Sequence, residues 1–209
     1  MTAEGFSVGW PGRGEPAAPG AHGPAPSLGA VFPSDAQRPA SAEGGTNSGR
    51  SDVSGAVLIG DGARISEAAP TLTGLGLDPV RSAQLVYLDP PYNRGGSFDG
   101  YHDNMPRHDW LTYIEARLRV AHDLLADTGS VWVHLDDAEA HRVRCLLDEV
   151  FGVESFIADL TVESNPKGRQ LDRYFAGSHD RLMVYARDPE QVVLEGGIAA
   201  YQAAGGTVV

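Results

Sequence analysis

The chain has 209 residues, with 28 acidic against 16 basic side chains and a formal net charge of -12. DNA-binding surfaces are usually basic, so the charge argues against a chain that contacts DNA over most of its surface. One cysteine excludes an internal disulfide and a cysteine metal cluster, and we expect no metal site. Without a signal peptide or an apolar run of membrane-helix length, the expected location is cytoplasmic.

Three regions are expected along the chain. Residues 1–54 are rich in Gly, Pro, Ala and Ser and show no helical or strand period. Such a composition buries too little apolar surface to offset the entropy of ordering, which predicts a disordered leader. Residues 55–190 are expected to form a partial catalytic domain, and residues 191–209 are left unassigned.

Two short apolar runs open the ordered part. Residues 56–59 read as a strand that ends at Gly60-Asp61-Gly62, and a weak helix follows within residues 65–77, where Pro70 interrupts the pattern. Residues 85–88 read as a second strand. This strand stops at two prolines, which cannot donate hydrogen bonds to a central ladder.

The rest of the domain alternates between helices and strands. Apolar residues at helical spacing predict one helix that stops at Asp127-Thr128-Gly129 and another that Gly152 ends. Strands are expected at residues 130–135, 156–162 and 182–186. The pattern predicts an α/β fold: a partial Rossmann-like, doubly wound, mainly parallel sheet with helices on both faces. The apolar helix positions are Trp110, Ile114, Leu118, Ala121 and Leu125, then Val143, Leu146, Leu147, Val150 and Phe151.

The segment Asp89-Pro90-Pro91-Tyr92 stands where a ligand would bind in such a sheet, after the carboxyl end of a strand. Two prolines hold the backbone extended and remove two N–H groups. The Asp89 carboxylate and a proline carbonyl can therefore present two acceptors side by side, next to the flat ring of Tyr92. A planar base with an exocyclic amino group fits this arrangement. A rigid exit turn from the strand is the alternative.

Together with its flanks, this segment resembles the catalytic region of adenine-N6 and cytosine-N4 DNA methyltransferases, and more narrowly the modification subunit of type III restriction-modification systems. The resemblance covers roughly residues 56–188. It rests on six blocks in order: 85–93, 98 and 101–104 with 110–111, 124–129, 131–139, 149–152 with 156–158, and 178–180 with 182–186.

The resemblance implies methyl transfer from S-adenosylmethionine to the amino group of a flipped-out base, with no covalent enzyme intermediate. Asp89 and the Pro90 carbonyl would accept the amino hydrogens, and Tyr92, with Asn93 beside it, would hold the base. Asp rather than Ser at the first position favours adenine N6 by resemblance. Cytosine-N4 or RNA amino-methylation are the alternatives.

Other residues carry two interpretations each. Asp61, like Asp89, is a candidate for the cofactor side of the site, although Gly60-Asp61-Gly62 is equally a tight turn. Asp136 and Asp137 either line the pocket or cap the next helix, and capping is favoured. His134 is interpreted as a packed histidine. The basic loop residues Lys167, Arg169 and Arg173 either meet DNA phosphates or lie in solvent.

A departure from the family limits these expectations. The Phe-x-Gly-x-Gly segment that resemblance places after the catalytic motif, where it binds the cofactor, is not found after Asp89. We therefore expect a truncated or split enzyme whose partners are DNA and either a restriction subunit or a complementing methyltransferase chain. The alternative is a catalytically inactive fragment that serves as an interaction module.

Overall fold

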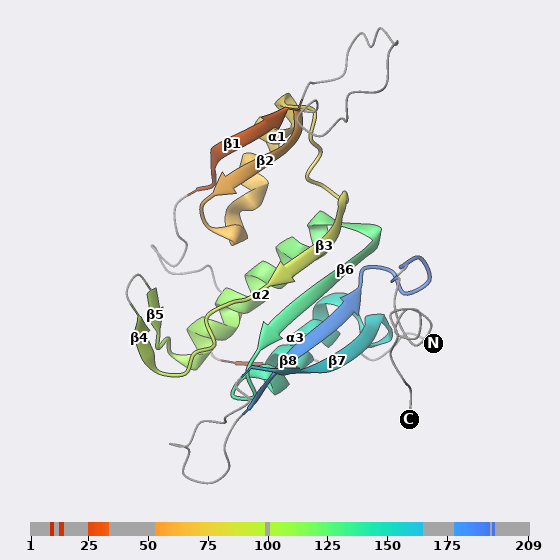
Figure 1. The fold of residues 1–209 in the computed structure, drawn as a ribbon. Helices are drawn as coiled ribbons and strands as arrows, with labels where there is room; N and C mark the ends of the chain where they lie inside the picture. The colour runs from red at the N-terminus through yellow and green to blue at the C-terminus, as the bar shows by residue number, and fades with distance from the viewer. Residues whose placement is uncertain are drawn as a thin grey trace, which may run out of the picture.

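The computed structural model describes residues 9–10, 13–14, 25–33, 53–98, 101–164, 178–192 and 194. Its centre is a four-stranded sheet with the order β3-β6-β8-β7 (Figure 1). Two helices, α2 (Arg107–Leu124) and α3 (Ala140–Phe151), pack on this sheet. The strands are β3 (Ala83–Leu88), β6 (Leu125–Leu135), β7 (Phe156–Glu163) and β8 (His179–Ala186).

The α/β class is confirmed, but the sheet is mixed where a mainly parallel one was expected. Only β3 and β6 pair in parallel; β8 runs antiparallel to both of its neighbours, β6 and β7. The reason is that β7 leads into β8 without an intervening described helix, so the chain turns back beside the strand it has just left. Sequence periodicity within one strand carries no information about which strand lies next to it.

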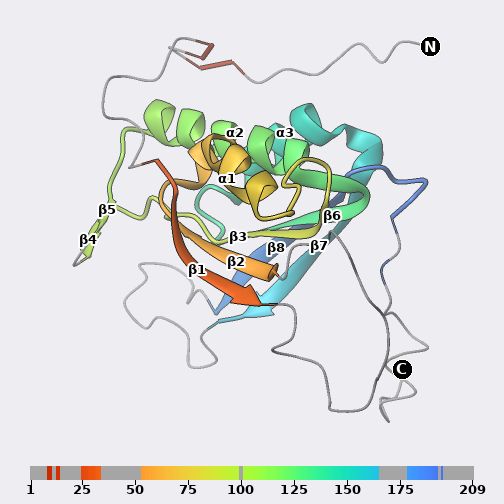
Figure 2. The same cartoon turned by 90° about the horizontal axis from the view of Figure 1, so that it is seen from above.

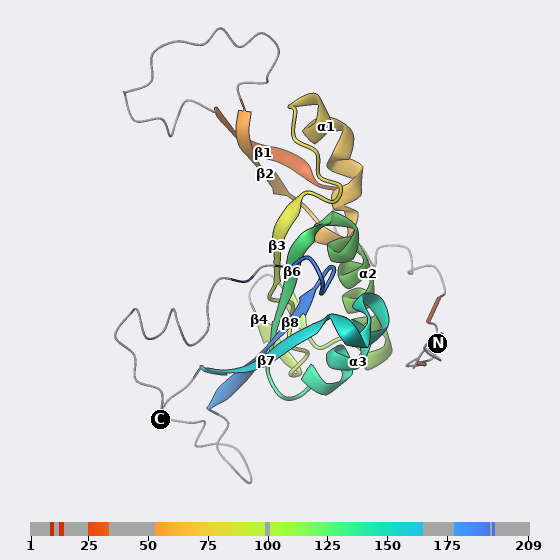
Figure 3. The same ribbon diagram turned by 90° about the vertical axis from the view of Figure 1, so that its right-hand side faces the viewer.

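The helices also depart from the expected doubly wound arrangement. Seen along the sheet, α2 and α3 lie on the same face, and no described helix covers the other (Figures 2 and 3). Crossovers between parallel strands are right-handed. The connections β3-α2-β6 and β6-α3-β7 advance across the sheet in the same direction, which places both helices on one side.

The core lies between this sheet face and the two helices. Alternate residues of β6 point into it: Val131, Val133 and Leu135 are fully buried. From α2, Trp110 and Leu118 are equally inaccessible, as the helical spacing predicted. Gly152, with φ of 93°, ends α3 at the predicted residue.

The boundary between α2 and β6 lies earlier than expected. The helix ends at Leu124, and Leu125 takes extended dihedrals as the first residue of β6. Gly129 then passes so close to β3 that an added Cβ would lie 2.6 Å from the Ala83 carbonyl oxygen. The Asp-Thr-Gly segment is thus a bulged part of a strand, not a helix stop.

Smaller elements flank the sheet. β1 (Ser27–Pro33) and β2 (Val53–Ile59) form an antiparallel hairpin, followed by the 3-10 helix η2 (Gly62–Ala68) and α1 (Ala69–Gly74). A second hairpin, β4 (Gly96–Phe98) with β5 (Tyr101–Asp103), precedes α2, and the short η3 (Val153–Ser155) follows α3. β1 lies inside the region expected to be disordered, and most of that region is outside the described residues.

The second sheet face is open in the described part of the chain. Leu85 and Tyr87 of β3 are 58% and 51% exposed there, and Leu160 of β7 is 43% exposed. β3 is also an edge strand, so one side of its backbone is unpaired within this sheet. No described helix is long and apolar enough to cross a membrane.

Candidate active site

The Asp89–Tyr92 segment leaves the carboxyl end of β3, as predicted, and several contacts fix its path. The indole Nε1 of Trp110 donates to the Pro91 carbonyl oxygen at 2.8 Å. Asn93 takes a left-handed conformation with φ of 58°, and its Oδ1 accepts the Met105 N–H at 2.8 Å. A buried tryptophan and the long-range hydrogen bond between Met105 and Asn93 therefore fix the chain at and just after the proline pair. The Asp89 side chain remains exposed.

Tyr92 is half-buried, and its surroundings favour the neutral phenol. Burial, and next the negative charge of Asp89, raise the pKa of Tyr92 far above its ordinary value. The Arg94 guanidinium carbon lies 5.1 Å from the centre of the Tyr92 ring, within cation–π range. A planar ligand that stacks on Tyr92 must therefore share the ring with Arg94 or displace it.

Behind Tyr92 lies a polar cluster that the sequence did not indicate. Arg94 pairs with Asp136 and lies 3.6 Å from Asp180, and both carboxylates are buried. His134 lies between the rings of Tyr87 and Tyr92; its Nδ1 is hydrogen-bonded to the Tyr87 hydroxyl at 2.9 Å. Its Nε2 is buried, has no hydrogen-bond partner and lies 3.6 Å from Asp180. The cluster anchors the wall on which Tyr92 leans.

A cavity of about 290 Å³ lies on the other side of the segment. Asp89 and Pro90 border it from β3, Gly62 from η2, and Tyr113 and Arg117 from α2. Its remaining walls are mostly apolar. This volume is at the lower end for small-molecule sites, which suits part of a cofactor better than the whole of one.

Asp61 is connected to this cavity by its ion-pair partner Arg117, which is one of the lining residues. It caps η2 by accepting the Ala63 N–H at 2.9 Å, and it pairs with Arg117, whose guanidinium lies over the Tyr113 ring. Asp61 therefore caps η2 and, through Arg117, lies next to the cavity; its role toward the cofactor stays a prediction. S-adenosylmethionine fits these surroundings in character: an apolar wall suits its adenine ring, and a nearby carboxylate suits its sulfonium charge.

The structure brings together some of the predicted site residues and not others. Asp89, Pro90, Tyr92 and Asn93 lie on one turn, and Asp61 lies across the cavity through Arg117. The expected capping of α3 by Asp136 or Asp137 is wrong. The N-cap of α3 is Glu139, whereas Asp136 accepts the Ala138 N–H and pairs with Arg94, and Asp137 is exposed. Lys167, Arg169 and Arg173 lie outside the described residues. No described residues form a metal-binding group.

Sequence reasoning missed Arg94, Trp110 as a hydrogen-bond donor, Arg117 and Asp180. Arg94 follows the motif directly, which could have marked it. The other three reach the site from α2 and β8 by tertiary packing; Trp110 and Asp180 lie in the resembling blocks, which hinted at a role, and Arg117 does not.

A strand-end Asp-Pro-Pro-Tyr beside a small cavity, on an α/β sheet, defines the class of amino-group methyltransferases. Comparison with known families supports this. The model of the N6/N4 DNA methylases, described as DNA methylase, matches residues 83–203. The chain belongs to this DNA methyltransferase family, whose methyl donor is S-adenosylmethionine.

Individual relatives match only part of the chain. The type II methyltransferase M.KpnI of Klebsiella pneumoniae is 32% identical over 125 residues, which cover 56% of this chain and 30% of that protein. The probable type III restriction-modification enzyme HindVI Mod subunit of Haemophilus influenzae is 32% identical over 114 residues, covering 53% and 15%. Among solved structures, the cytosine-N4-specific PvuII DNA methyltransferase matches with a TM-score of 0.42 and 16% identity, covering 71% of this chain and 62% of that one. The chain thus spans less than a third of the length of both relatives.

Proposed function

We propose that this chain carries the catalytic part of a site-specific adenine-N6 DNA methyltransferase that uses S-adenosylmethionine. The position of Asp89-Pro90-Pro91-Tyr92 carries the proposal: it joins an exposed carboxylate, an anchored proline pair and a half-buried aromatic ring at the edge of a cavity. Adenine rather than cytosine rests on Asp89 at the first position of the motif.

In this proposal each residue has a task. Because the Pro91 carbonyl already accepts from Trp110, the Pro90 carbonyl is the backbone acceptor in this proposal, beside the Asp89 carboxylate. Both accept hydrogens of the flipped adenine amino group, which aims the nitrogen lone pair away from the ring plane. Tyr92 stacks on the base. When bound, S-adenosylmethionine would supply a sulfonium methyl group; the N–C bond would form as the S–C bond breaks and a neutral thioether leaves, and the nitrogen would release one proton to solvent. Positioning accounts for most of the rate in such a transfer.

The same observations support a complementing chain as a partner. The open face and free edge of β3 expose Leu85 and Tyr87, where a complete sheet would bury them. We therefore propose a complementing methyltransferase chain that covers this face as one partner. DNA and a restriction subunit are the other proposed partners, because two relatives are named as type III modification subunits.

A chimera tests the catalytic assignment. Residues 83–188 replace the matching segment of M.KpnI, and methyl transfer to unmethylated duplex DNA is followed by mass spectrometry of the nucleosides. We expect N6-methyl-2′-deoxyadenosine, and a loss on the order of a hundred- to a thousand-fold in Asp89→Ala, as for removal of a preorganised polar group. The control is Glu154→Gln, an exposed change within the transplanted segment. N4-methyl-2′-deoxycytidine as the product would overturn the adenine assignment.

A second measurement uses the chain itself and checks its incompleteness. Calorimetry with S-adenosylmethionine should show at most weak binding, with a dissociation constant near or above about 1 mM, because only part of a site is present. Micromolar binding would contradict the need for a complementing chain. Saturation-transfer NMR should still detect adenosine at Tyr92, with the signal lost in Tyr92→Ala, and this result does not depend on the cofactor.

A further inference from the structure

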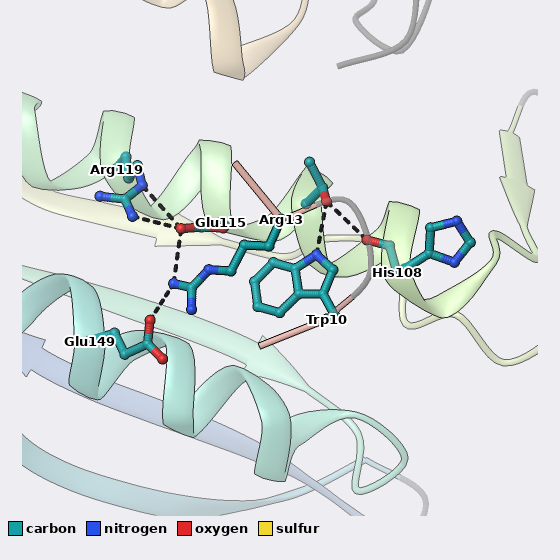
Figure 4. A network of polar contacts seen from close by, with 7 residues as sticks. Trp10, Arg13, His108, Glu115, Arg119 and Glu149 are labelled. Carbon is teal, nitrogen blue, oxygen red and sulfur yellow. Dashed lines mark hydrogen bonds and ion pairs between the residues drawn. The ribbon is translucent and has the colours of Figure 1, made fainter. Parts of the chain in front are cut away.

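Part of the expected leader makes specific contacts on the outer side of the two helices. Trp10 and Arg13 lie across α2 and α3 on the solvent side (Figure 4). The backbone N–H of Arg13 donates to the Trp10 carbonyl oxygen at 3.2 Å, which closes a turn between them. The Arg13 guanidinium carbon lies 4.6 Å from the centre of the Trp10 ring. The two side chains therefore form one compact unit.

This unit is held at two anchor points. The Trp10 indole N–H donates to Thr112 Oγ1 on α2 at 3.1 Å, and the ring packs against the hydrophobic core. Arg13 Nη2 donates to Glu115 of α2 at 3.1 Å and also to Glu149 of α3. One guanidinium thus joins two helices that are far from it in sequence.

The receiving surface is acidic and largely shielded from water. The side chains of Glu115 and Glu149 are 12% and 9% exposed, and that of Arg13 is 18% exposed. Both carboxylates bond the same Arg13 nitrogen, so they are no farther apart than the sum of those two contacts. Without a cation between them, two carboxylates this close repel each other. Arg13 therefore stabilises this carboxylate pair, together with Arg119, which also bonds Glu115; we call the surface formed by Thr112, Glu115 and Glu149 the groove.

The groove is separate from the candidate active site. Thr112, Glu115 and Arg119 follow one another at i, i+3 and i+7 on α2, whereas Tyr113 and Arg117 of the same helix line the cavity. The docked segment therefore restrains, from its outer side, the helix that bounds the cavity.

We propose that the groove formed by Thr112, Glu115 and Glu149 is a peptide-docking site for a Trp-turn-Arg segment, and that residues 9–14 are its tethered ligand. The segment exchanges between a docked and a free state. In the docked state it clamps α2 to α3; in the free state the Arg13–Gly14 bond is open to trypsin, which must take the arginine side chain into its own pocket. Proteolysis then reports the population of the free state.

The test measures tryptic cleavage after Arg13 in the folded full chain, by mass spectrometry of the released fragment. The reference is a synthetic peptide of residues 1–24. We expect cleavage at least tenfold slower in the chain than in the peptide. Glu149→Gln should raise the rate at least threefold, and so should Thr112→Val, which keeps the shape but removes the Trp10 anchor. The matched control is Glu154→Gln, an exposed change next to α3, with no effect.

Circular dichroism confirms that each variant is folded, and a variant that unfolds is replaced by Glu115→Gln. Equal rates in chain and peptide, or no response to both groove substitutions, would overturn the proposal. The source of the segment is tested by dilution. Protection that is constant over a hundredfold range of concentration supports docking of the chain's own leader. Protection that falls on dilution would overturn this, because the segment would then come from a second copy.

Discussion

Arg94 is the residue whose loss should damage the site most without touching the motif. It neutralises Asp136 and lies near Asp180, two carboxylates that are only 4% and 7% exposed. Removing one partner of a buried pair leaves a charge without compensation. Because Arg94 itself is 28% exposed, we expect a cost below the full value, roughly 1–3 kcal/mol of unfolding free energy for Arg94→Ala.

Urea denaturation followed by circular dichroism measures this cost. The matched control is Arg64→Ala, whose partner Glu67 lies at 2.7 Å but whose ion pair is solvent-exposed, so its loss should leave the unfolding free energy nearly unchanged. Equal losses of unfolding free energy in the two variants would show that Arg94 does not stabilise the cluster behind Tyr92.

Whether a residue of the site could be predicted from the sequence depends on how far it lies along the chain from the residues it contacts. Asp89 to Tyr92 could be predicted because a local run carries the whole signal: strand, two prolines and an aromatic ring. Arg117 and Asp180 could not, because their roles arise only when α2 and β8 pack beside β3 and β6. His134 was expected to be packed, and it is, but its place between two tyrosines depends on strand register.

At the scale of elements, position 129, in the bulged part of β6 next to β3, should tolerate only glycine. In Gly129→Ala the new Cβ would lie 2.6 Å from the Ala83 carbonyl oxygen and 2.9 Å from Leu125 Cδ2. The backbone cannot yield as a side-chain end can, so we expect a loss of about 1–3 kcal/mol, typical of overpacking. Thermal and urea unfolding measure it. The control is Gly74→Ala in α1, where nothing lies within 4 Å; there the change should be neutral or slightly stabilising.

The ion pair between Arg13 and Glu115, which holds the leader on α2, should contribute less to the stability of the fold as the pH falls into the acidic range. Burial by itself would raise the pKa of Glu115, but hydrogen bonds from Arg13 and Arg119 outweigh burial and lower that pKa below its ordinary value of 4.5. A group with a lowered folded pKa stabilises the fold above its ordinary pKa, and this contribution is lost as the pH falls through the folded pKa. Glu115→Gln should therefore lower stability at pH 7.

The difference between the native chain and Glu115→Gln should shrink as the pH falls below 4.5 and through the lowered folded pKa, where the native carboxylate becomes protonated. Urea midpoints from pH 7 down into this acidic range measure it, with Glu154→Gln as the exposed control. A difference that does not shrink as the pH is lowered would mean that the charge of Glu115 contributes nothing.

Helices and strands with a clear period were predictable as single elements: α2, α3 and β6 are where the apolar stripes placed them, within a few residues. Their arrangement was not. The position of β8 between β6 and β7, and the placing of both helices on one face, follow from crossover direction. β1 was not predicted, because its pairing with β2 is long-range and because the composition around it is typical of a disordered segment.

At the scale of the whole molecule, the open face of the sheet should make the isolated chain self-associate. Leu85, Tyr87 and Leu160 are exposed there by 58%, 51% and 43%, and β3 is a free edge strand within the described sheet. An apolar face next to a strand edge is the usual route to association. Leu85→Lys places a charge on this face and should shift the chain toward the monomer.

Sedimentation velocity at increasing concentration measures that shift. Val80→Lys is the matched control, because Val80 is 55% exposed but precedes β3 and lies outside the sheet; it should associate like the native chain. If both variants associate equally, the open face is not the contact. If Leu85→Lys alone is monomeric, the same substitution should also block a complementing chain. Incompleteness of the sheet and dependence on a partner would then have one physical origin, the uncovered side of β3.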